Sequence, residues 1–419
     1  MTDTLQTKVT LKSSFETGDI PTQSEFDDLI TSTLVEGGNS SGSLVAAAVN
    51  IGQNTLATGT KGSFAQGNTV TATGNNGSFA QGTNATASGN NGSFAQGTAA
   101  TASGNNGSFA QGALAIASGI YGSFAQGNTA TASGNSASFA QGALVIASGN
   151  NGSFAQGSIV TVTGNNGSFA QGALAIASGS NGSFAQGSNA TASGNNGSFA
   201  QGSKATASGN SASFAQGALV IANGNWGSFA QGAVAEATGS YGSFAQGNNT
   251  SATGNNGSFA QGRITSATGN TGSFAQGDYS MTSGSNGSFA QGNTVIVTGA
   301  NGSFAQGFRA TASGTNGSFA QGNLATASGN SGSFAQGSKA TASGQGSWAV
   351  GSNVVASNVH SMVFGINAIN DVATSIQIGA TGPRLIGSGV PTSPRNGDIW
   401  VDGSGNVIIR SGGSNVTIA

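Results

Sequence analysis

Few residues of this chain could carry out chemistry. It has one histidine, His360, and no cysteine, so metal sites built on imidazole or thiolate, and Ser or Cys triads, lack their parts. The many serines have no base to activate them. We expect His360 to be structural, in a corner of the fold, and we assign Asp398 and Asp402 to the turn of a hairpin. The sequence therefore predicts no enzyme activity, no cofactor and no metal.

The composition excludes further classes of function. Of 419 residues 73 are glycine, charged residues make up 5%, and the formal net charge is -2. This balance lacks the basic face that nucleic-acid binding requires. No apolar run is long enough to span a bilayer, and the first residues lack the basic and apolar regions of a secretory signal. We expect synthesis in the cytoplasm without a signal peptide, and no membrane insertion.

The dominant feature is a repeat of fifteen residues that contains the hexapeptide GSFAQG, first seen at 62–67. Its phenylalanine recurs without a slip from Phe64 to Phe334, in nineteen copies, and the period then shortens to fourteen at Trp348. A short period held this long predicts a β-solenoid of stacked coils. Residues 45–380 should form about 23 coils, which at about 4.8 Å per strand would give a rod of about 110 Å.

Each repeat divides into two short strands, such as 63–66 and 85–88. Side chains alternate along a strand, so Phe64 and Gln66 share one face and Ser63 and Ala65 share the other. We predict that the Phe column is a stacked aromatic core and the Gln column an internal amide ladder. The reason is that the Gln column holds large apolar residues near the ends of the rod, at Ile51, Val350, Phe364 and Ile378.

The second strand gives the opposite pattern. The columns of Ala85 and Ala87 hold mainly small or β-branched residues and should point inward, whereas those of Thr83, Asn84 and Thr86 vary freely and should face water. The variable columns contain all the charged residues between positions 62 and 344, namely Lys204, Glu236, Arg263, Asp278, Arg309 and Lys339.

Glycines separate the strands in three further columns. Those of Gly67 and Gly74 are never replaced among the internal copies, which predicts special backbone geometry there. The turn glycine of the Gly77 column is replaced by Ala137 and Ala212. We therefore predict that this turn does not require a positive φ.

The outer face also carries candidate contact residues. In several copies the columns of Asn84 and Thr86 become apolar together, and these pairs either pack on a neighbouring chain or on each other, or form a contact strip for a ligand or a second fibre. Tyr121, Trp226 and Tyr241 occupy a turn column and are suited to stacking on sugars. The candidate outer-surface residues are Leu114, Ile116, Leu144, Ile146, Leu174, Ile176, Leu219, Ile221, Trp226 and Tyr241.

The two ends differ from the repeat. Residues 1–44 contain a capping box at Thr22–Glu25 that predicts a helix to about Leu34, and this segment should either cap the solenoid or anchor it to a larger particle. Residues 381–419 should end in a β-hairpin with strands at 397–401 and 406–410. We expect Trp400 and its neighbours to pack on symmetry-related copies and so to form a C-terminal tip or a trimerisation cap.

Ser347–Gly351 (SWAVG) and the two following coils resemble the head repeats of trimeric autotransporter adhesins of the YadA-like kind, and the GSFAQG copies match with one extra residue. The resemblance covers about four-fifths of the chain. It implies a left-handed parallel β-roll, a homotrimer and an adhesive or fibrous role. The secretory signal and membrane anchor of that family are not visible, whereas Phe15–Ile30 and Pro394–Asp402 resemble segments of phage tail proteins and tail fibres.

We therefore expect a rigid homotrimeric fibre of a virus particle, a phage tail or capsid fibre that serves host-surface attachment. Its partners would be its own copies, a baseplate or capsid protein bound through residues 1–44, and a host-surface glycan or protein. The alternatives are a bacterial cell-surface or biofilm adhesin, a fibre of an extracellular contractile injection particle, and an ice-binding solenoid whose regular Thr columns order water.

Overall fold

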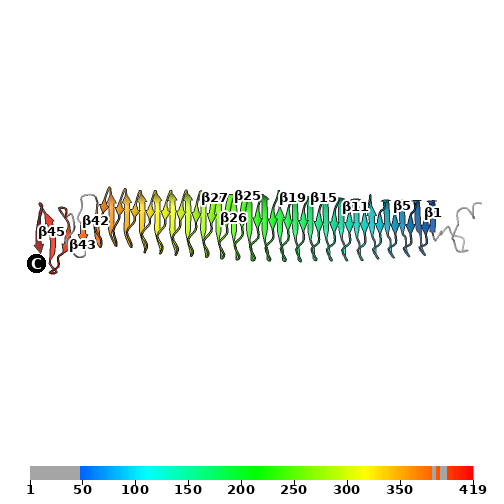
Figure 1. The fold of residues 1–419 in the computed structure, drawn as a ribbon, viewed down its shortest axis with the longest axis horizontal. Helices are drawn as coiled ribbons and strands as arrows, with labels where there is room; N and C mark the ends of the chain where they lie inside the picture. Colours follow the sequence, from blue (N-terminus) through cyan, green and yellow to red (C-terminus); the bar gives the residue numbers. More distant parts are fainter. Residues whose placement is uncertain (1–47, 380–383, 387–393, 419) are drawn as a thin grey trace, which may run out of the picture. The chain divides into compact units, whose positions relative to one another are not determined.

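The computed structural model describes residues 48–379, 384–386 and 394–418, and these form strands and turns without a helix. They build a parallel β-solenoid of about 23 turns with a repeat of about 15 residues, as the sequence predicts (Figure 1). The predicted helix at 22–34 and the segment 1–44 lie outside the described residues. Two compact units, Met1–Asn196 and Gly197–Ala419, make up the chain.

In Met1–Asn196, each coil supplies one long and one short strand, and each strand pairs in parallel with its equivalent one repeat later. Phe64 lies opposite Phe79 and Thr71 opposite Thr86, so a column in the sequence is a column in space. The long strands are β1 (Ala48–Gln53), β3 (Ser63–Asn68), β5 (Phe79–Thr83), β7 (Phe94–Thr98), β9 (Phe109–Gln111), β11 (Phe124–Asn128), β13 (Phe139–Ala143), β15 (Phe154–Ser158), β17 (Phe169–Ala173) and β19 (Phe184–Ser188). The short strands are β2 (Leu56–Ala57), β4 (Thr71–Ala72), β6 (Thr86–Ala87), β8 (Thr101–Ala102), β10 (Ile116–Ala117), β12 (Thr131–Ala132), β14 (Ile146–Ala147), β16 (Thr161–Val162), β18 (Ile176–Ala177) and β20 (Thr191–Ala192).

Gly197–Ala419 repeats this plan, and in β25 (Phe229–Ala237), β26 (Phe244–Ala252) and β27 (Phe259–Ala267) the two strands of a coil join into one. The other long strands are β21 (Phe199–Gln201), β23 (Phe214–Ala218), β28 (Phe274–Asp278), β30 (Phe289–Asn293), β32 (Phe304–Phe308), β34 (Phe319–Asn323), β36 (Phe334–Ser338), β38 (Trp348–Ser352), β40 (Met362–Ile366) and β42 (Ser375–Ile378). The short strands are β22 (Thr206–Ala207), β24 (Ile221–Ala222), β29 (Met281–Thr282), β31 (Ile296–Val297), β33 (Thr311–Ala312), β35 (Thr326–Ala327), β37 (Thr341–Ala342), β39 (Val355–Ala356) and β41 (Ile369–Asn370).

The strand pairing confirms where the fifteen-residue repeat was predicted to begin and where its period was predicted to shorten. Val49 of the first coil pairs with Phe64, fifteen residues on. Phe334 pairs with Trp348 and Trp348 with Met362, so the period is fourteen in these coils. One residue fewer per coil leaves the long strand in place and shortens only the turn between Gly344 and Ser347.

The interior of the fifteen-residue coils is built from small side chains. Ser63 is 1% exposed, and Ala65, Val70 and Ala72 are fully buried. The inward direction predicted for the columns of Ala85 and Ala87 is therefore confirmed. The predicted facing of the first strand is wrong, because its Ser and Ala columns point inward, while Phe64 and Gln66 lie on the outer surface and are partly covered.

The size of the coil explains this reversal. A loop of fifteen residues brings its two strands back over each other across short turns, which leaves room for Ala against Ala or Val but not for an aromatic ring. Turning Phe64 and Gln66 inward would place two large side chains between strands that the turns hold close together. The apolar replacements in the Gln column therefore indicate a half-covered surface, not an interior.

Two glycine columns have the special geometry that their invariance within the chain predicts. Gly67 has a φ of +134°, and a Cβ on it or on Gly74 would clash with the carbonyl oxygen of the equivalent glycine one coil later. The prediction for the turn column is wrong, because Gly77 has a φ of +64° and Ala137 keeps a φ of +47° at the same corner. The turn therefore imposes the left-handed region on alanine too.

After β42 the sheet continues into a C-terminal tip of four strands, β43 (Arg384–Ile386), β44 (Ile399–Val401), β45 (Val407–Ser411) and β46 (Ser414–Ile418). The order is β42–β43–β44–β45–β46, with parallel pairing only between β43 and β44. The predicted hairpin is present as β44 and β45, and β46 adds a third strand. Asp402 accepts hydrogen bonds from the amides of Ser404 and Asn406 at 2.9 Å and so stabilises the hairpin turn.

The tip has its own core within the chain. Trp400 is 1% and Ile408 6% exposed, so the Trp400 side chain is covered within its own chain, and packing of Trp400 and its neighbours on symmetry-related copies stays a prediction. The assignment of Asp398 to the hairpin turn is also wrong. Its buried carboxylate accepts two hydrogen bonds from the buried guanidinium of Arg384, at 2.8 and 2.5 Å, and raises the pKa of that arginine. The ion pair joins β43 to the start of β44.

A pair of neighbouring positions tests which side of the strand faces inward. Ala155→Leu should lower the free energy of unfolding by about 1–3 kcal/mol, because the interior has no room for the added atoms. Gln156→Leu, on the outer face, should change it by less than about 1 kcal/mol. Urea unfolding followed by circular dichroism gives both values. A larger loss for Gln156→Leu than for Ala155→Leu would contradict the facing described above.

Candidate functional surfaces

The first candidate surface is the outer side of the long strands, formed by the columns of Phe64 and Gln66, and we name it the Phe–Gln face. The rings stack almost parallel, for example Phe94 on Phe109 with centroids 4.7 Å apart and planes at 4°. The amides form a ladder in which Gln81 donates from Nε2 to Oε1 of Gln66 at 2.7 Å. The predicted aromatic stack and amide ladder are both present, but on the surface of the coil.

This face is unusual for a surface in contact with water. Each stacked ring covers its neighbours, so that ring edges and amide edges point outward in two parallel rows. The columns contain no charged residue. Long, uncharged, partly apolar surfaces are typical of protein–protein contacts. The Phe–Gln face can therefore pack against another flat, uncharged surface.

The second candidate surface is the variable face, formed by the columns of Thr83, Asn84 and Thr86, which run from the end of the long strand to the short strand. Its exposure is confirmed by the charged residues, which lie at the surface as predicted. In neighbouring coils Arg263 and Asp278 form an ion pair at 2.8 Å, and the hydrogen bond to Asp278 raises the pKa of Arg263. The guanidinium of Arg263 also lies 4.9 Å from the ring centre of Tyr279.

The predicted apolar pairs lie on the variable face and are exposed. Leu114 and Ile116 are 54% and 39% exposed, and the other pairs have similar values. In Met1–Asn196 the pairs occur in every second coil, with Thr131 and Thr161 in the coils between them. We name them the Leu–Ile pairs: Leu114 with Ile116, Leu144 with Ile146, Leu174 with Ile176, and Leu219 with Ile221.

The leucine of each pair occupies a backbone position that sequence reasoning missed. The whole Asn84 column adopts a left-handed conformation, with a φ of +57° at Asn84, +56° at Leu114 and +57° at the β-branched Ile159. This region costs about 1–2 kcal/mol for a residue other than glycine, although asparagine adopts it readily. The signal was the recurrence of Asn in this column, at Asn54, Asn84, Asn189, Asn249, Asn353 and Asn367.

The third candidate surface is the turn edge, formed by the column of Asn76. Here Asn76 donates from Nδ2 to Oδ1 of Asn91 at 2.7 Å, so the turns carry an amide ladder of their own. Trp226 and Tyr241 interrupt it in adjacent coils, where their backbones pair, and are 58% and 56% exposed. Tyr121 is a third exposed aromatic at this edge, 57% exposed.

The residues considered first for chemistry do not come together. His360 is exposed at a coil corner with a φ of +54°, in the column of the turn glycine Gly77. Within the described residues no three His, Cys, Asp or Glu side chains lie close enough to hold a metal ion. The described part of the chain also has no helix with the length and apolarity to traverse a membrane. A regular solenoid of this kind is typical of structural proteins.

The chain matches no protein-family model, and no curated protein is significantly similar to it in sequence. The fold defines the class as a β-solenoid repeat protein, which is compatible with a fibre or another structural role.

Substitutions in one Leu–Ile pair separate backbone strain from side-chain burial. Leu144→Asn should raise the free energy of unfolding by about 1 kcal/mol, because asparagine tolerates the left-handed region better than leucine. Ile146→Asn, in the extended strand β14, removes a similar exposed side chain and should lower it by up to about 1 kcal/mol. Thermal or urea unfolding measures both. Equal effects would contradict a role for the backbone at Leu144.

Proposed function

We propose that this chain is the subunit of a homotrimeric structural fibre of a virus particle, a phage tail or capsid fibre. The observation that carries the proposal is the Phe–Gln face. Two uncharged rows of ring and amide edges follow the long strands from coil to coil, and an isolated chain would expose them to water. Packing against copies of the same face would cover them without burying any charge.

The number of copies in this proposal comes from the resemblance of the repeats to YadA-like heads, which are trimeric. The Phe–Gln face by itself requires only that at least one further copy of the chain covers it. Parallel packing of three chains would place every Phe–Gln face at the common axis. The variable face and the turn edge of each chain would then remain outside, where they can contact a host-surface glycan or protein.

The attachment role is proposed for the outer surfaces. The exposed Trp226 and Tyr241 suit stacking on a sugar ring, and the Leu–Ile pairs suit an apolar protein contact. An adhesin or a fibre of an extracellular injection particle would use the same surfaces. An ice-binding role gains no support, because Ile116, Ile146 and Ile176 interrupt the Thr86 column in every second coil of that stretch.

The mass in solution tests the assembly. A homotrimer of a 40.1 kDa chain should have a mass of about 120 kDa. Light scattering coupled to size exclusion, or native mass spectrometry, gives the value directly. A mass near 80 kDa would contradict the number of chains, and a mass near 40 kDa would contradict self-association as a whole.

Particle imaging tests the site of action. Particles produced with the full chain should carry fibres that a chain-specific antibody labels in electron micrographs. A chain that lacks residues 1–44 should leave the particles unlabelled, because we propose that this segment binds the baseplate or capsid. A Leu144→Asn chain is the matched control and should label normally. Labelling of particles by the shortened chain would contradict N-terminal anchoring.

A further inference from the structure

A surface made of identical repeats cannot by itself define how copies of the chain align. Between Phe199 and Gln336 the two columns of the Phe–Gln face hold only Phe and only Gln, ten of each. If one copy slides along another by a whole coil, Phe again meets Phe and Gln meets Gln. The slipped arrangement loses only the contacts of the terminal coils, which no longer face a coil of the other copy. Alignment must therefore come from residues that do not repeat.

The same face stops repeating at its C-terminal end. Where the repeat has Phe and Gln, the next coils have Trp348 with Val350 and then Met362 with Phe364. The last coil has Ile376 with Ile378. Parallel pairing keeps each of these residues in line with the coil before it. Each of these three coils thus presents its own pair of side chains at the positions where the repeating coils, which we call the shaft, present Phe and Gln.

The stripe continues in register across the tip. Ile376 pairs with Leu385 of β43, Leu385 with Ile399 of β44, Ile399 with Ile409 of β45, and Ile409 with Val416 of β46. Directly cross-strand residues share one face of a sheet. The apolar row that begins with phenylalanine in the shaft therefore runs over the outer face of the tip as branched aliphatic side chains.

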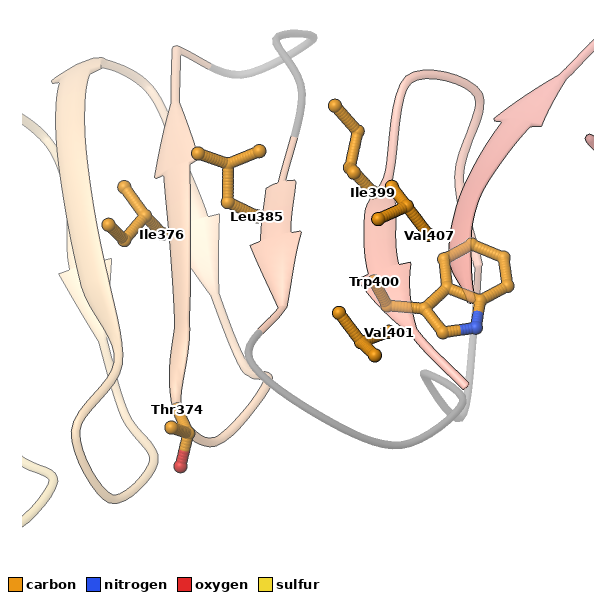
Figure 2. Close-up of a pocket in the computed structure, with 7 residues that line it drawn as sticks. All are labelled: Thr374, Ile376, Leu385, Ile399, Trp400, Val401 and Val407. Atoms are coloured by element: carbon orange, nitrogen blue, oxygen red, sulfur yellow. The ribbon is translucent and has the colours of Figure 1, made fainter. Parts of the chain in front are cut away.

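This outer face of the tip is exposed, although the opposite face of the same sheet is packed. Leu385 is 43%, Val407 38% and Val416 48% exposed, whereas Trp400 and Ile408 are buried. An open apolar cleft of about 330 Å³ lies here (Figure 2). It is lined by Thr374, Ile376, Leu385, Ile399, Trp400, Val401 and Val407.

The lining of the cleft indicates what occupies it. It contains no charged group, because Arg384 of the same sheet points to the other face and is paired there with Asp398. The cleft continues the Phe–Gln face strand by strand, so a copy that packs on that face in the shaft arrives at the cleft with its own uncharged, apolar stripe. The occupant that fits is therefore a second copy of this chain.

We infer that the non-repeating stripe from Trp348 to Val416, with its cleft, sets the register in which copies of the chain align. This inference rests on the self-association proposed above. The repeating part of the face supplies contact area, which is nearly the same in every slipped alignment. The unique side chains of the tip match only when all copies end at the same level, so they single out one alignment.

The test uses disulfide trapping, because the chain has no cysteine of its own. Two single-cysteine variants of the full chain, Gln216→Cys and Gln246→Cys, place a thiol on the Phe–Gln face two coils apart, which is about 9.6 Å. That separation exceeds the roughly 4.4–6.8 Å between Cα atoms that a disulfide spans. Refolded mixtures should therefore give bonds between identical positions, while bonds between the two different positions report slippage.

Two sets of substitutions should then raise the mixed fraction, that is, the fraction of disulfide bonds that join position 216 to position 246, by about tenfold. Leu385→Ser with Val407→Ser removes exposed apolar contacts of the tip, and hydrogen exchange of the β44 and β45 amides checks that the tip still folds. The second set is Trp348→Phe, Val350→Gln, Met362→Phe and Phe364→Gln, which makes two coils copies of the repeat without removing a packed core. Leu144→Ser with Leu174→Ser, on the variable face, is the control and should change nothing.

The outcomes separate the two levels of the proposal. A monomeric mass without bonds between identical positions would overturn self-association through this face, and the register inference with it. An oligomer with such bonds, in which both sets of changes leave the mixed fraction at the level of the control, would overturn the register inference alone. An increase with both sets supports it.

Discussion

In-register parallel pairing is the constraint on which the rest of the structure depends. It places each side chain about 4.8 Å from the side chain at the equivalent position of the next coil. A constant column can therefore hold only residue types that pack favourably against identical neighbours. Rings stack, and Gln and Asn amides donate and accept along the column. Like charges would repel at this distance, which accounts for the low charge of the shaft. Among the coils that the structure describes, the one pair of charges in adjacent coils of one column, Arg263 and Asp278, has opposite signs.

The repeat was sufficient to predict the class of fold, its period and the exposed variable columns, because these depend on spacing alone. It was not sufficient to decide which side of the long strand faces inward. Alternation separates Phe64 and Gln66 from Ser63 and Ala65, but apolar replacements in the Gln column fit an interior and a contact surface equally well. The volume of the coil decides between them, since a fifteen-residue loop with short turns encloses only small side chains.

The left-handed backbone conformation of the Asn84 column was the other feature that the residue types did not predict. The left-handed column contains Asn, Thr, Leu, Ile, Val, Lys, Arg and Tyr, and this variety hides a conformation that most of these residues disfavour. Neighbouring coils hold the corner in place through hydrogen bonds such as Asn84 N–H to the carbonyl of Asn68 at 2.9 Å. The stack therefore overrides local preference at every corner, and the exposed leucines of the Leu–Ile pairs are retained at a cost to stability.

The constant columns of the Phe–Gln face and the variable columns occupy different positions around the coil, and this separation has a consequence for recognition. If copies pack through the constant Phe–Gln face, substitutions on the variable face and the turn edge leave the assembly contacts untouched. Each such substitution appears once in every copy, at the same level when the copies are in register. A weak contact to one sugar or one apolar groove would then be presented several times on one rigid scaffold, and linked sites gain avidity when their spacing allows simultaneous binding. Register thus matters for binding as well as for assembly, because slipped copies would present their variable residues at different levels.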